Sequence, residues 1–377
     1  MEKTSKKRFR FGKQILAVAL ILIVAIIGAV YTYIHMTYEY VQIVKTFESE
    51  STNDGSYTQY TDGVLEYSRD GIALLTKEGK ELWNQPTQMN NPIVEVCKDA
   101  AAVADKGGTS ICVFQKNGLK GEIQTTRPIE KIAVSSQGIV ATILQDEETP
   151  MVMCYDAKGN VLVEHKASLS NTGYPVDLAI SQDGKVLLVS YLCTKGNGIV
   201  TRAVFYHFGQ AGEDKMDHQV AQKEYVDAVI PTTSFLDKNT SLLVSDQSLI
   251  FYKGLEEPKE SLVVDLNKEI KSISYDDKHI ALVLKNSEKA GYEMRLYNIE
   301  GKHVTSAEFE GEYANIKVSK GQVLLYEGNK CIIFNDSGVC KYEGTLEMNV
   351  MDIFPVTGMN KYIVISANGF QEIQLAK

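Results

Sequence analysis

The sequence predicts an all-β protein, a β-propeller of eight blades preceded by one N-terminal transmembrane helix. Three observations lead to this prediction. Residues 15–34 carry no charge, and about 20 apolar positions are enough to cross a bilayer as a helix. From Tyr57 onward, short runs of Val, Ile, Leu and Tyr alternate with turn residues, which is typical of antiparallel strands. These strands recur every 40 residues or so, roughly the period of propeller blades.

The flanks of the apolar stretch predict its orientation. A basic cluster precedes it, against one acidic residue, Glu2: Lys3, Lys6, Lys7, Arg8, Arg10 and Lys13. Segments rich in Lys and Arg stay in the cytoplasm. We therefore expect a basic cytoplasmic tail at 1–14, a transmembrane signal anchor at 15–36, and an extracytoplasmic remainder at the cell membrane. A cleaved secretory signal is the alternative, but its apolar core would be shorter and no Ala-x-Ala cleavage pattern follows.

Residues 37–56 are predicted to be a linker that contains a possible closing strand. Residues 39–47 alternate well enough to form a strand, and the polar stretch 48–55 separates them from the repeats. The propeller itself is expected at 57–377.

Two kinds of turn mark the repeat. A glycine supplies the positive φ of the hairpin between third and fourth strands at Gly79, Gly118, Gly159, Gly301 and Gly338. The turn between first and second strands falls near Asp62, Asp99, Gln137, Asp183, Asp237, Asp277, Lys320 and Gly358. Eight such turns predict eight blades, with seven as the rival count. The last unit, 349–375, has three strands, so we expect the strand near 40–47 to complete it and close the ring.

Charge limits the classes of partner. The chain of 377 residues has a net charge of −9, and its leader carries six bases and one acid, so the remainder carries −14. A domain this acidic lacks the basic footprint that nucleic acids require. We expect no nucleic-acid partner.

The six cysteines are spread thinly and include no C-x-x-C pair. Cys331 and Cys340 flank a turn at 335–338. If Asp336 and Ser337 form a two-residue turn, Ile333 faces Cys340 and the two sulfurs lie diagonally, at the edge of disulfide reach. Buried thiols are favoured over a disulfide framework, since a domain of this size does not need cross-links.

Several stretches resemble known propeller repeats. Residues 79–83 (GKELW) and 155–162 (YDAKGNVL) resemble quinoprotein-like repeats, and residues 181–190 (SQDGKVLLVS) resemble a WD-type blade. Nearly the whole chain resembles a family of single-pass bacterial membrane proteins of unknown function with a propeller-like outer domain. The stretches that carry this resemblance are 67–71 (YSRDG), 173–177 (GYPVD), 189–192 (VSYL) and 205–209 (FYHFG). The resemblance implies an architecture and no activity.

The sequence offers no catalytic constellation. Quinone dehydrogenases with this type of propeller carry a Trp in most blades and an adjacent Cys pair, whereas this chain has one Trp, Trp83, which we expect to cover a blade edge. The loop between His207 and His218 holds metal-capable residues, but their spacing fits no ligand pattern and a solvated loop is favoured. We expect no catalytic residue, cofactor or metal.

Propellers bind partners at one face, where the loops between second and third strands meet the connections between blades. We call this the loop face. Its predicted residues are Arg69, Asp70, Asp105, Lys106, Arg127, Asp146, Glu147, Tyr174, Lys195, Asn197 and Asn329. They are also the residue types of any exposed loop.

Three functional hypotheses follow. The preferred one is a membrane-anchored module that binds a protein, ligand or envelope component as a scaffold. The alternative is a hydrolase or lyase of envelope carbohydrate with carboxylates that converge in the central channel; facing carboxylates would favour it, and an empty or apolar channel would exclude it. The third is a sensor that signals through the single helix.

Overall fold

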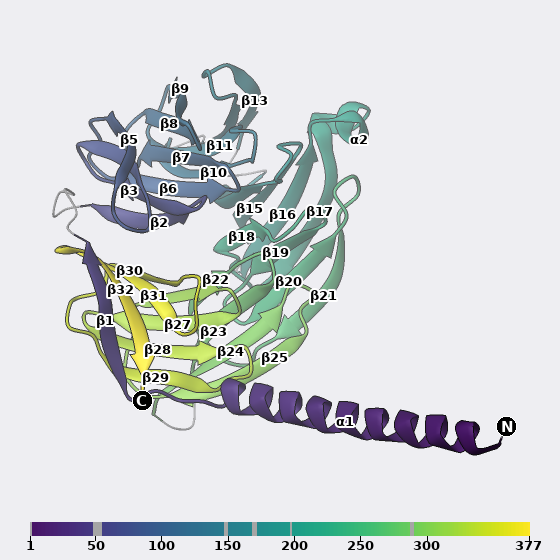
Figure 1. The fold of residues 1–377 in the computed structure, drawn as a ribbon. Helices are drawn as coiled ribbons and strands as arrows, with labels where there is room; N and C mark the ends of the chain where they lie inside the picture. Colours follow the sequence, from purple (N-terminus) through teal and green to yellow (C-terminus); the bar gives the residue numbers. More distant parts are fainter. Residues whose placement is uncertain (1, 48–54, 147–149, 168–171, 197, 287–289) are drawn as a thin grey trace.

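The computed structural model describes residues 2–47, 55–146, 150–167, 172–196, 198–286 and 290–377, and describes side chains of the first helix from Val18 on. This helix, α1 (Glu2–Ile34), projects away from the β-domain (Figure 1). The side chains of the predicted cytoplasmic tail, 1–14, lie outside the described ones. Among the described residues, no helix is both long and apolar enough to cross a membrane.

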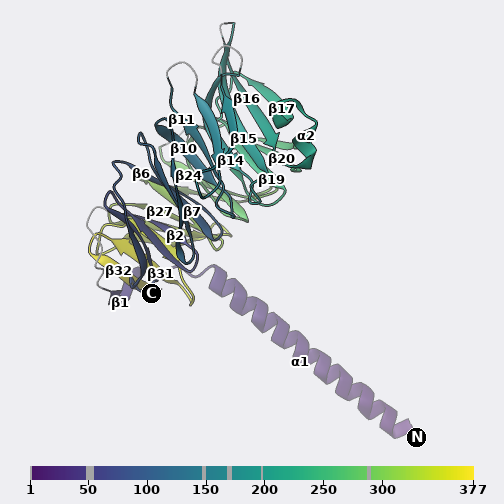
Figure 2. The same ribbon diagram turned by 90° about the horizontal axis from the view of Figure 1, so that it is seen from above.

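The β-domain is a ring of blades. The described residues form eight four-stranded antiparallel sheets, which we number as blades 1–8. Blades 1–7 use their strands in chain order, from β2–β5 to β26–β29, whereas blade 8 has the order β1-β32-β31-β30. Figure 2 shows the ring turned by 90°. The prediction of eight blades is confirmed, and the rival count of seven is wrong.

The strands of the first four blades have the following bounds. Blade 1 contains β2 (Ser56–Tyr60), β3 (Gly63–Tyr67), β4 (Gly71–Leu75) and β5 (Glu81–Pro86). Blade 2 contains β6 (Pro92–Cys97), β7 (Ala100–Asp105), β8 (Ser110–Gln115) and β9 (Gly118–Gln124). Blade 3 contains β10 (Ile129–Val134), β11 (Val140–Leu144), β12 (Met151–Tyr155) and β13 (Val161–Lys166). Blade 4 contains β14 (Tyr174–Ile180), β15 (Val186–Lys195), β16 (Gly198–His207) and β17 (Gln219–Val226), with α2 (Gln210–Glu213) and the 3-10 turn η1 (Met216–His218) before β17.

The remaining blades follow the same plan. Blade 5 contains β18 (Thr232–Phe235), β19 (Thr240–Val244), β20 (Ser248–Lys253) and β21 (Lys259–Asp265). Blade 6 contains β22 (Ile270–Tyr275), β23 (His279–Lys285), β24 (Tyr292–Asn298) and β25 (His303–Phe309). Blade 7 contains β26 (Asn315–Ser319), β27 (Gln322–Glu327), β28 (Lys330–Asn335) and β29 (Cys340–Thr345). Blade 8 contains β30 (Asp352–Pro355), β31 (Lys361–Ser366), β32 (Gly369–Ala376) and β1 (Tyr40–Phe47).

The hydrophobic core is divided among the junctions between blades. Each pair of neighbouring blades shares one cluster of buried side chains in the described part of the chain. The cluster between blades 8 and 1 packs Phe354 and Phe370 against Val64. Because every blade buries both faces in this way, the middle strands are largely apolar, as in β12 (MVMCY) and β28 (KCIIFN).

Strand β1 closes the ring, as the alternation at 39–47 predicts. It pairs antiparallel with β32, with Tyr40 opposite Ala376 and Phe47 opposite Phe370. The first and last strands of the chain therefore share one sheet, which covers the edge that β32 would otherwise expose.

The predicted turns are also confirmed. Each of the eight turn positions lies between the first and second strands of a blade. The hairpin glycines have positive φ, from 76° at Gly338 to 116° at Gly118. At Gly79, Gly159 and Gly338 the N–H bonds to the carbonyl three residues earlier, which is the geometry of a tight turn followed by a left-handed residue.

The predicted register around Cys331 and Cys340 is wrong. Cys340 pairs with Phe334, not with Ile333, and Cys331 pairs with Gly344. The turn is longer than two residues because it includes the left-handed Gly338, and the extra residue of β29, Lys341, makes a bulge opposite Ile333 and Phe334. All six cysteines are free thiols.

The end of α1 is fixed to blade 7. The carbonyls of the last helical turn at Tyr33 and Ile34 accept hydrogen bonds from Lys341 Nζ at 3.0 Å and Asn335 Nδ2 at 2.9 Å. Lys341 is 5% exposed and lies over the rings of Tyr33 and Tyr38. A cation at a helix C-terminus also complements the helix dipole. These contacts join the end of the helix to β28 and β29 of blade 7.

The junction and the loop face lie on opposite sides of the ring. Asn335 stands at the hairpin between β28 and β29, and in blades 1–7 the hairpin between the third and fourth strands lies opposite the loop between the second and third strands. In Figure 2 the far end of β15 and β16 points away from the side on which α1 leaves. The helix therefore leaves the loop face uncovered.

Candidate functional site

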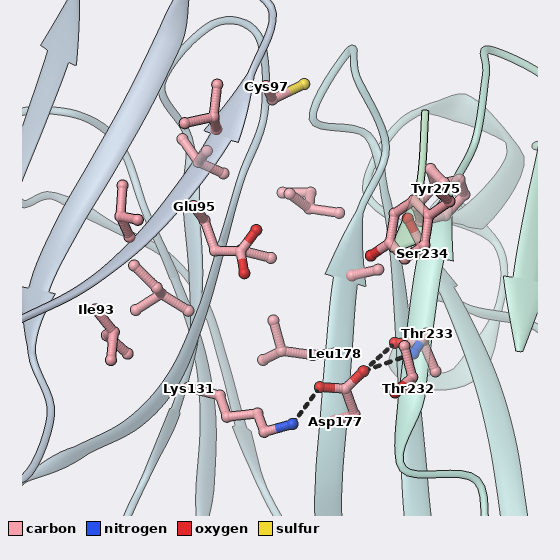
Figure 3. Close-up of a pocket in the computed structure, with 18 of the residues that line it drawn as sticks. Ile93, Glu95, Cys97, Lys131, Asp177, Leu178, Thr232, Thr233, Ser234 and Tyr275 are labelled. Carbon is pink, nitrogen blue, oxygen red and sulfur yellow. Dashed lines mark hydrogen bonds and ion pairs between the residues drawn. The ribbon is translucent and has the colours of Figure 1, made fainter. Parts of the chain in front are cut away.

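The first strand of each blade lines the axis of the ring, and these strands build the main cavity. The cavity has a volume of about 710 Å³ and is lined by β6, β10, β14 and β18, with Tyr67 from blade 1 and Tyr275 from blade 6. Figure 3 shows polar side chains that point into it from several strands. The channel is therefore lined by polar side chains and is not apolar.

Asp177 is the most heavily engaged group in the cavity. Its Oδ1 accepts from Lys131 Nζ at 2.7 Å, which joins blades 4 and 3. Its Oδ2 accepts from the N–H of Thr233 at 2.6 Å and from the Thr233 hydroxyl at 3.0 Å (Figure 3). Asp177 is 8% exposed. Burial raises the pKa of its carboxyl, while Lys131 and Thr233 oppose that rise by stabilising the charge.

Glu95 differs from Asp177 because its carboxylate points into the cavity and, among the described residues, has no hydrogen-bond or ion-pair partner. Within the described part of the chain, only burial and distant charges act on it (Figure 3). The Glu95 side chain is exposed to the water of the cavity, and protein surrounds that water. The surrounding protein, which limits hydration of the carboxylate, and the charge of Asp177 raise the pKa of Glu95 to about 7, and Lys131 opposes them. Glu95 is therefore partly protonated near neutral pH.

Hydroxyl groups complete the lining. The Tyr275 hydroxyl bonds to Ser234, and burial raises the pKa of Tyr275 to about 12, with smaller contributions from Glu95 and Asp177. Thr232 also lines the cavity beside Thr233. These hydroxyls can donate to or accept from a polar ligand.

A second axial ion pair lies four blades further round the ring. Lys317 on β26 contacts both carboxylate oxygens of Asp352 on β30 at 2.6 Å. Tyr326 donates to Asp352 at 3.2 Å, and burial with the nearby carboxylate raises the pKa of Tyr326. Like Lys131 with Asp177, this pair links the first strands of consecutive blades.

Several predicted loop-face residues are occupied in holding the loops. Asp105 is 5% exposed and accepts the N–H groups of Asn90 and Asn91 at 2.9 and 2.8 Å. Arg127 forms an ion pair with Asp146 across the same loop cluster. These side chains position the loop face.

Other predicted residues bond to neighbouring strands. Tyr174 donates to Glu130 at 2.7 Å, and burial together with Glu130 raises the pKa of Tyr174 to about 12. Lys195 pairs with Glu224 at 3.0 Å. Asn329 Nδ2 lies 3.4 Å from the Leu346 carbonyl.

The remaining predicted residues are exposed or not described. Arg69, Asp70 and Lys106 are exposed at the loop face, and Lys106 also lines the cavity. Glu147 and Asn197 lie outside the described residues. The structure thus assembles Lys106 with the axial groups but does not gather the other candidates into one site.

Sequence reasoning missed the axial groups Glu95, Lys131, Asp177 and Tyr275. A usable signal was present for Glu95 and Asp177, because each is the one charged residue in the middle of a first strand. A charge at such a position must face water, and the water nearest to a first strand is in the channel.

Two secondary features have structural explanations. Trp83 stacks on Phe114 of the next blade with ring centroids 5.0 Å apart, so it covers a blade edge. His207 accepts the Gly209 N–H at 3.0 Å, and His218 bonds to the Gly212 carbonyl at 3.1 Å. Neither histidine belongs to a group of three metal-capable residues in the described chain.

The fold and the cavity define this protein as an eight-bladed β-propeller with a polar axial channel. The chain belongs to the family of unknown function DUF5711, whose model matches residues 34–375. No curated protein matches the sequence.

Two solved structures are similar to this chain, and the first of them supports the fold. BamB from Moraxella catarrhalis is 11% identical, with a TM-score of 0.52 over 89% of this chain and 99% of that chain. The β-propeller domain of Cps50 (Swd1) from Myceliophteria thermophila is 12% identical, with a TM-score of 0.49 over 78% of this chain and 96% of that chain. At these identities the likeness is one of fold alone.

Proposed function

We propose that this protein is a membrane-anchored scaffold whose propeller lies outside the cytoplasm and binds a protein or envelope component at its loop face. The observation that carries the proposal is the position of α1, which joins the ring on the side opposite the loop face. A tether placed there leaves the loop face and the channel mouth accessible to a partner. The basic leader and the apolar stretch 15–34 support the membrane location.

The fixed junction supports a scaffold in particular. Capping of α1 by Lys341 and Asn335 holds the ring in one orientation relative to the helix. A partner that is anchored to the same membrane then meets a surface that is already oriented. Binding loses less orientational freedom in that case, which favours association.

Co-purification tests the binding role. The tagged full chain is isolated from cells in detergent, beside a variant with Asp70→Lys at the loop face. The matched control reverses the charge of exposed Glu122 on the outer strand β9. We expect the loop-face variant to lose a partner that the control retains. An identical set of co-purifying proteins in all three samples would overturn the binding role.

Labelling in intact cells tests the location. Single cysteines are introduced at Ser5 in the leader and at Glu122, and a membrane-impermeant maleimide is added. Labelling in excess of the unaltered chain is expected at 122 in intact cells and at 5 only after the membrane is permeabilised. The reverse pattern would contradict the proposed orientation.

One observation favours the second candidate, a hydrolase or lyase of envelope carbohydrate. Glu95 and Asp177 line the same cavity, and the raised pKa of Glu95 suits a general acid. Asp177, however, already accepts three hydrogen bonds and has little freedom to act as a base. Release of reducing ends from cell-wall polysaccharide by the purified chain, abolished by Glu95→Gln, would establish this activity, and no release would exclude it.

A further inference from the structure

The axial carboxylates differ in whether they have a counter-ion. Asp177 is paired with Lys131, and Asp352 is paired with Lys317. Glu95 lies in the same cavity as the first pair, and in the described part of the chain no hydrogen bond or ion pair reaches its carboxylate. The lining as a whole has more acidic than basic side chains, with five acids, Glu95, Glu130, Asp177, Asp276 and Asp277, against three bases, Lys98, Lys106 and Lys131, so the cavity carries an excess of negative charge.

The surroundings of Glu95 favour a cation over an anion. The titratable groups that face it are Tyr67, Lys131, Asp177 and Tyr275, from blades 1, 3, 4 and 6. The one ammonium among them is already held by Asp177 at 2.7 Å. The two carboxylates would repel an anion, whereas a cation would reduce the repulsion between them.

We propose that the axial cavity binds a cationic group, the guanidinium or ammonium of a basic side chain on the partner, with Glu95 as its counter-ion. This inference rests on the proposed function, because it names the part of the partner that enters the ring. The group would enter from the loop face past Lys106 and reach Glu95 in the middle of β6. Ser234 and Tyr275 offer hydroxyls for its remaining hydrogen bonds.

Size and overall charge agree with this ligand. A cavity of about 710 Å³ lies within the range of small-ligand sites, roughly 300–1,000 Å³. It can hold an arginine or lysine side chain with adjacent backbone. The chain beyond the leader carries −14, so its long-range field draws basic ligands toward the ring. A metal ion is a poorer fit, because the described residues contain no group of three metal-capable side chains.

A pair of neutral-blocked peptides tests the proposal without any cellular partner. The purified full chain in detergent is titrated with acetyl-Gly-Arg-Gly-amide and with the same peptide containing citrulline, which has the shape of arginine without its charge. We expect the arginine peptide to bind at least about tenfold more tightly. Glu95→Gln should abolish that preference, and Glu95→Asp and the outer-strand control Glu122→Gln should retain it.

Proton release gives an independent readout. Because the cation favours the ionised form of Glu95, binding at pH 7 should release a fraction of a proton, and affinity should fall as the pH drops below 7. Calorimetry in two buffers of different ionisation enthalpy measures this release. Glu95→Gln should release none.

The outcomes separate this inference from the proposed function. Equal affinity for the two peptides, or a preference that survives Glu95→Gln in a folded variant, would overturn the cation site. A clear arginine preference together with unchanged co-purification at the loop face would refute the scaffold role and keep the site. Thermal unfolding of each variant confirms that it is folded.

Discussion

Replacement of Glu95 by glutamine should stabilise the protein at alkaline pH and have little effect at acid pH. The folded protein raises the pKa of Glu95 from its ordinary 4.5 to about 7. Between these values the native state holds more protons than the unfolded state, so the free energy of unfolding falls as the pH rises. The contribution of Glu95 is present below pH 4.5 and is lost as the pH passes 7. Glutamine is neutral throughout and does not suffer this loss.

The magnitude follows from the size of the shift. At about 1.4 kcal/mol per pKa unit, the full shift corresponds to roughly 3 kcal/mol. The Glu95 carboxylate faces solvent in the cavity, which screens the interaction, so we expect a smaller effect of about 1–2 kcal/mol.

Thermal unfolding of the full chain at pH 5 and pH 8 measures this effect. Each kcal/mol moves Tm by roughly 2–4 °C in a large domain, so Glu95→Gln should exceed the unaltered chain by several degrees at pH 8 and by only about a quarter as much at pH 5, where the folded carboxyl is still protonated. Comparison at each pH cancels the other titrating groups, and Glu122→Gln serves as the matched control. A difference that is the same at both pH values, or one that appears only at pH 5, would refute the reasoning.

Three further predictions concern the fold and its tether. Asp177→Ala leaves the buried Thr233 N–H without its acceptor, so the free energy of unfolding in urea should fall by about 3 kcal/mol; an unchanged midpoint would contradict the role of this pair. Deletion of 1–39 should leave a monomeric ring, whereas deletion of 1–47 uncovers the edge of β32 and should cause aggregation in gel filtration; equal behaviour would argue against closure by β1. Lys341→Met removes the amine that caps α1, so spin-label distances between helix and blade 7 should broaden while stability changes by less than about 1 kcal/mol; an unchanged distribution would show that the cap is not what orients the helix.

The architecture could be predicted because local chemistry repeats in every blade. A tight turn needs a residue that tolerates positive φ, so positions such as Gly79 and Gly159 mark the period directly. The closing role of residues 40–47 could be predicted because the last unit had only three strands, and a ring of blades must cover the edges of its sheets. The register near Cys340 could not be predicted in the same way, because it depends on whether the turn includes Gly338, and one residue shifts every pairing after it.

The candidate site could be predicted only at its rim. Loop residues were identified by type, but type does not distinguish a side chain that awaits a partner from one that holds a loop, as Asp105 and Arg127 do. The axial groups come from different blades, and their approach depends on the closure of the ring. Glu95 and Asp177 are 82 positions apart in the sequence, yet they line one cavity.

The most direct test of the central claim is site-specific photo-cross-linking in intact cells. A photoreactive residue is placed at Lys106, at the mouth of the channel, and in a second strain at Glu122 on the outer strand of blade 2. We expect a specific adduct from position 106 that is absent from position 122 and weakened when Glu95→Gln is added. The same adducts from both positions, or none from position 106, would contradict it.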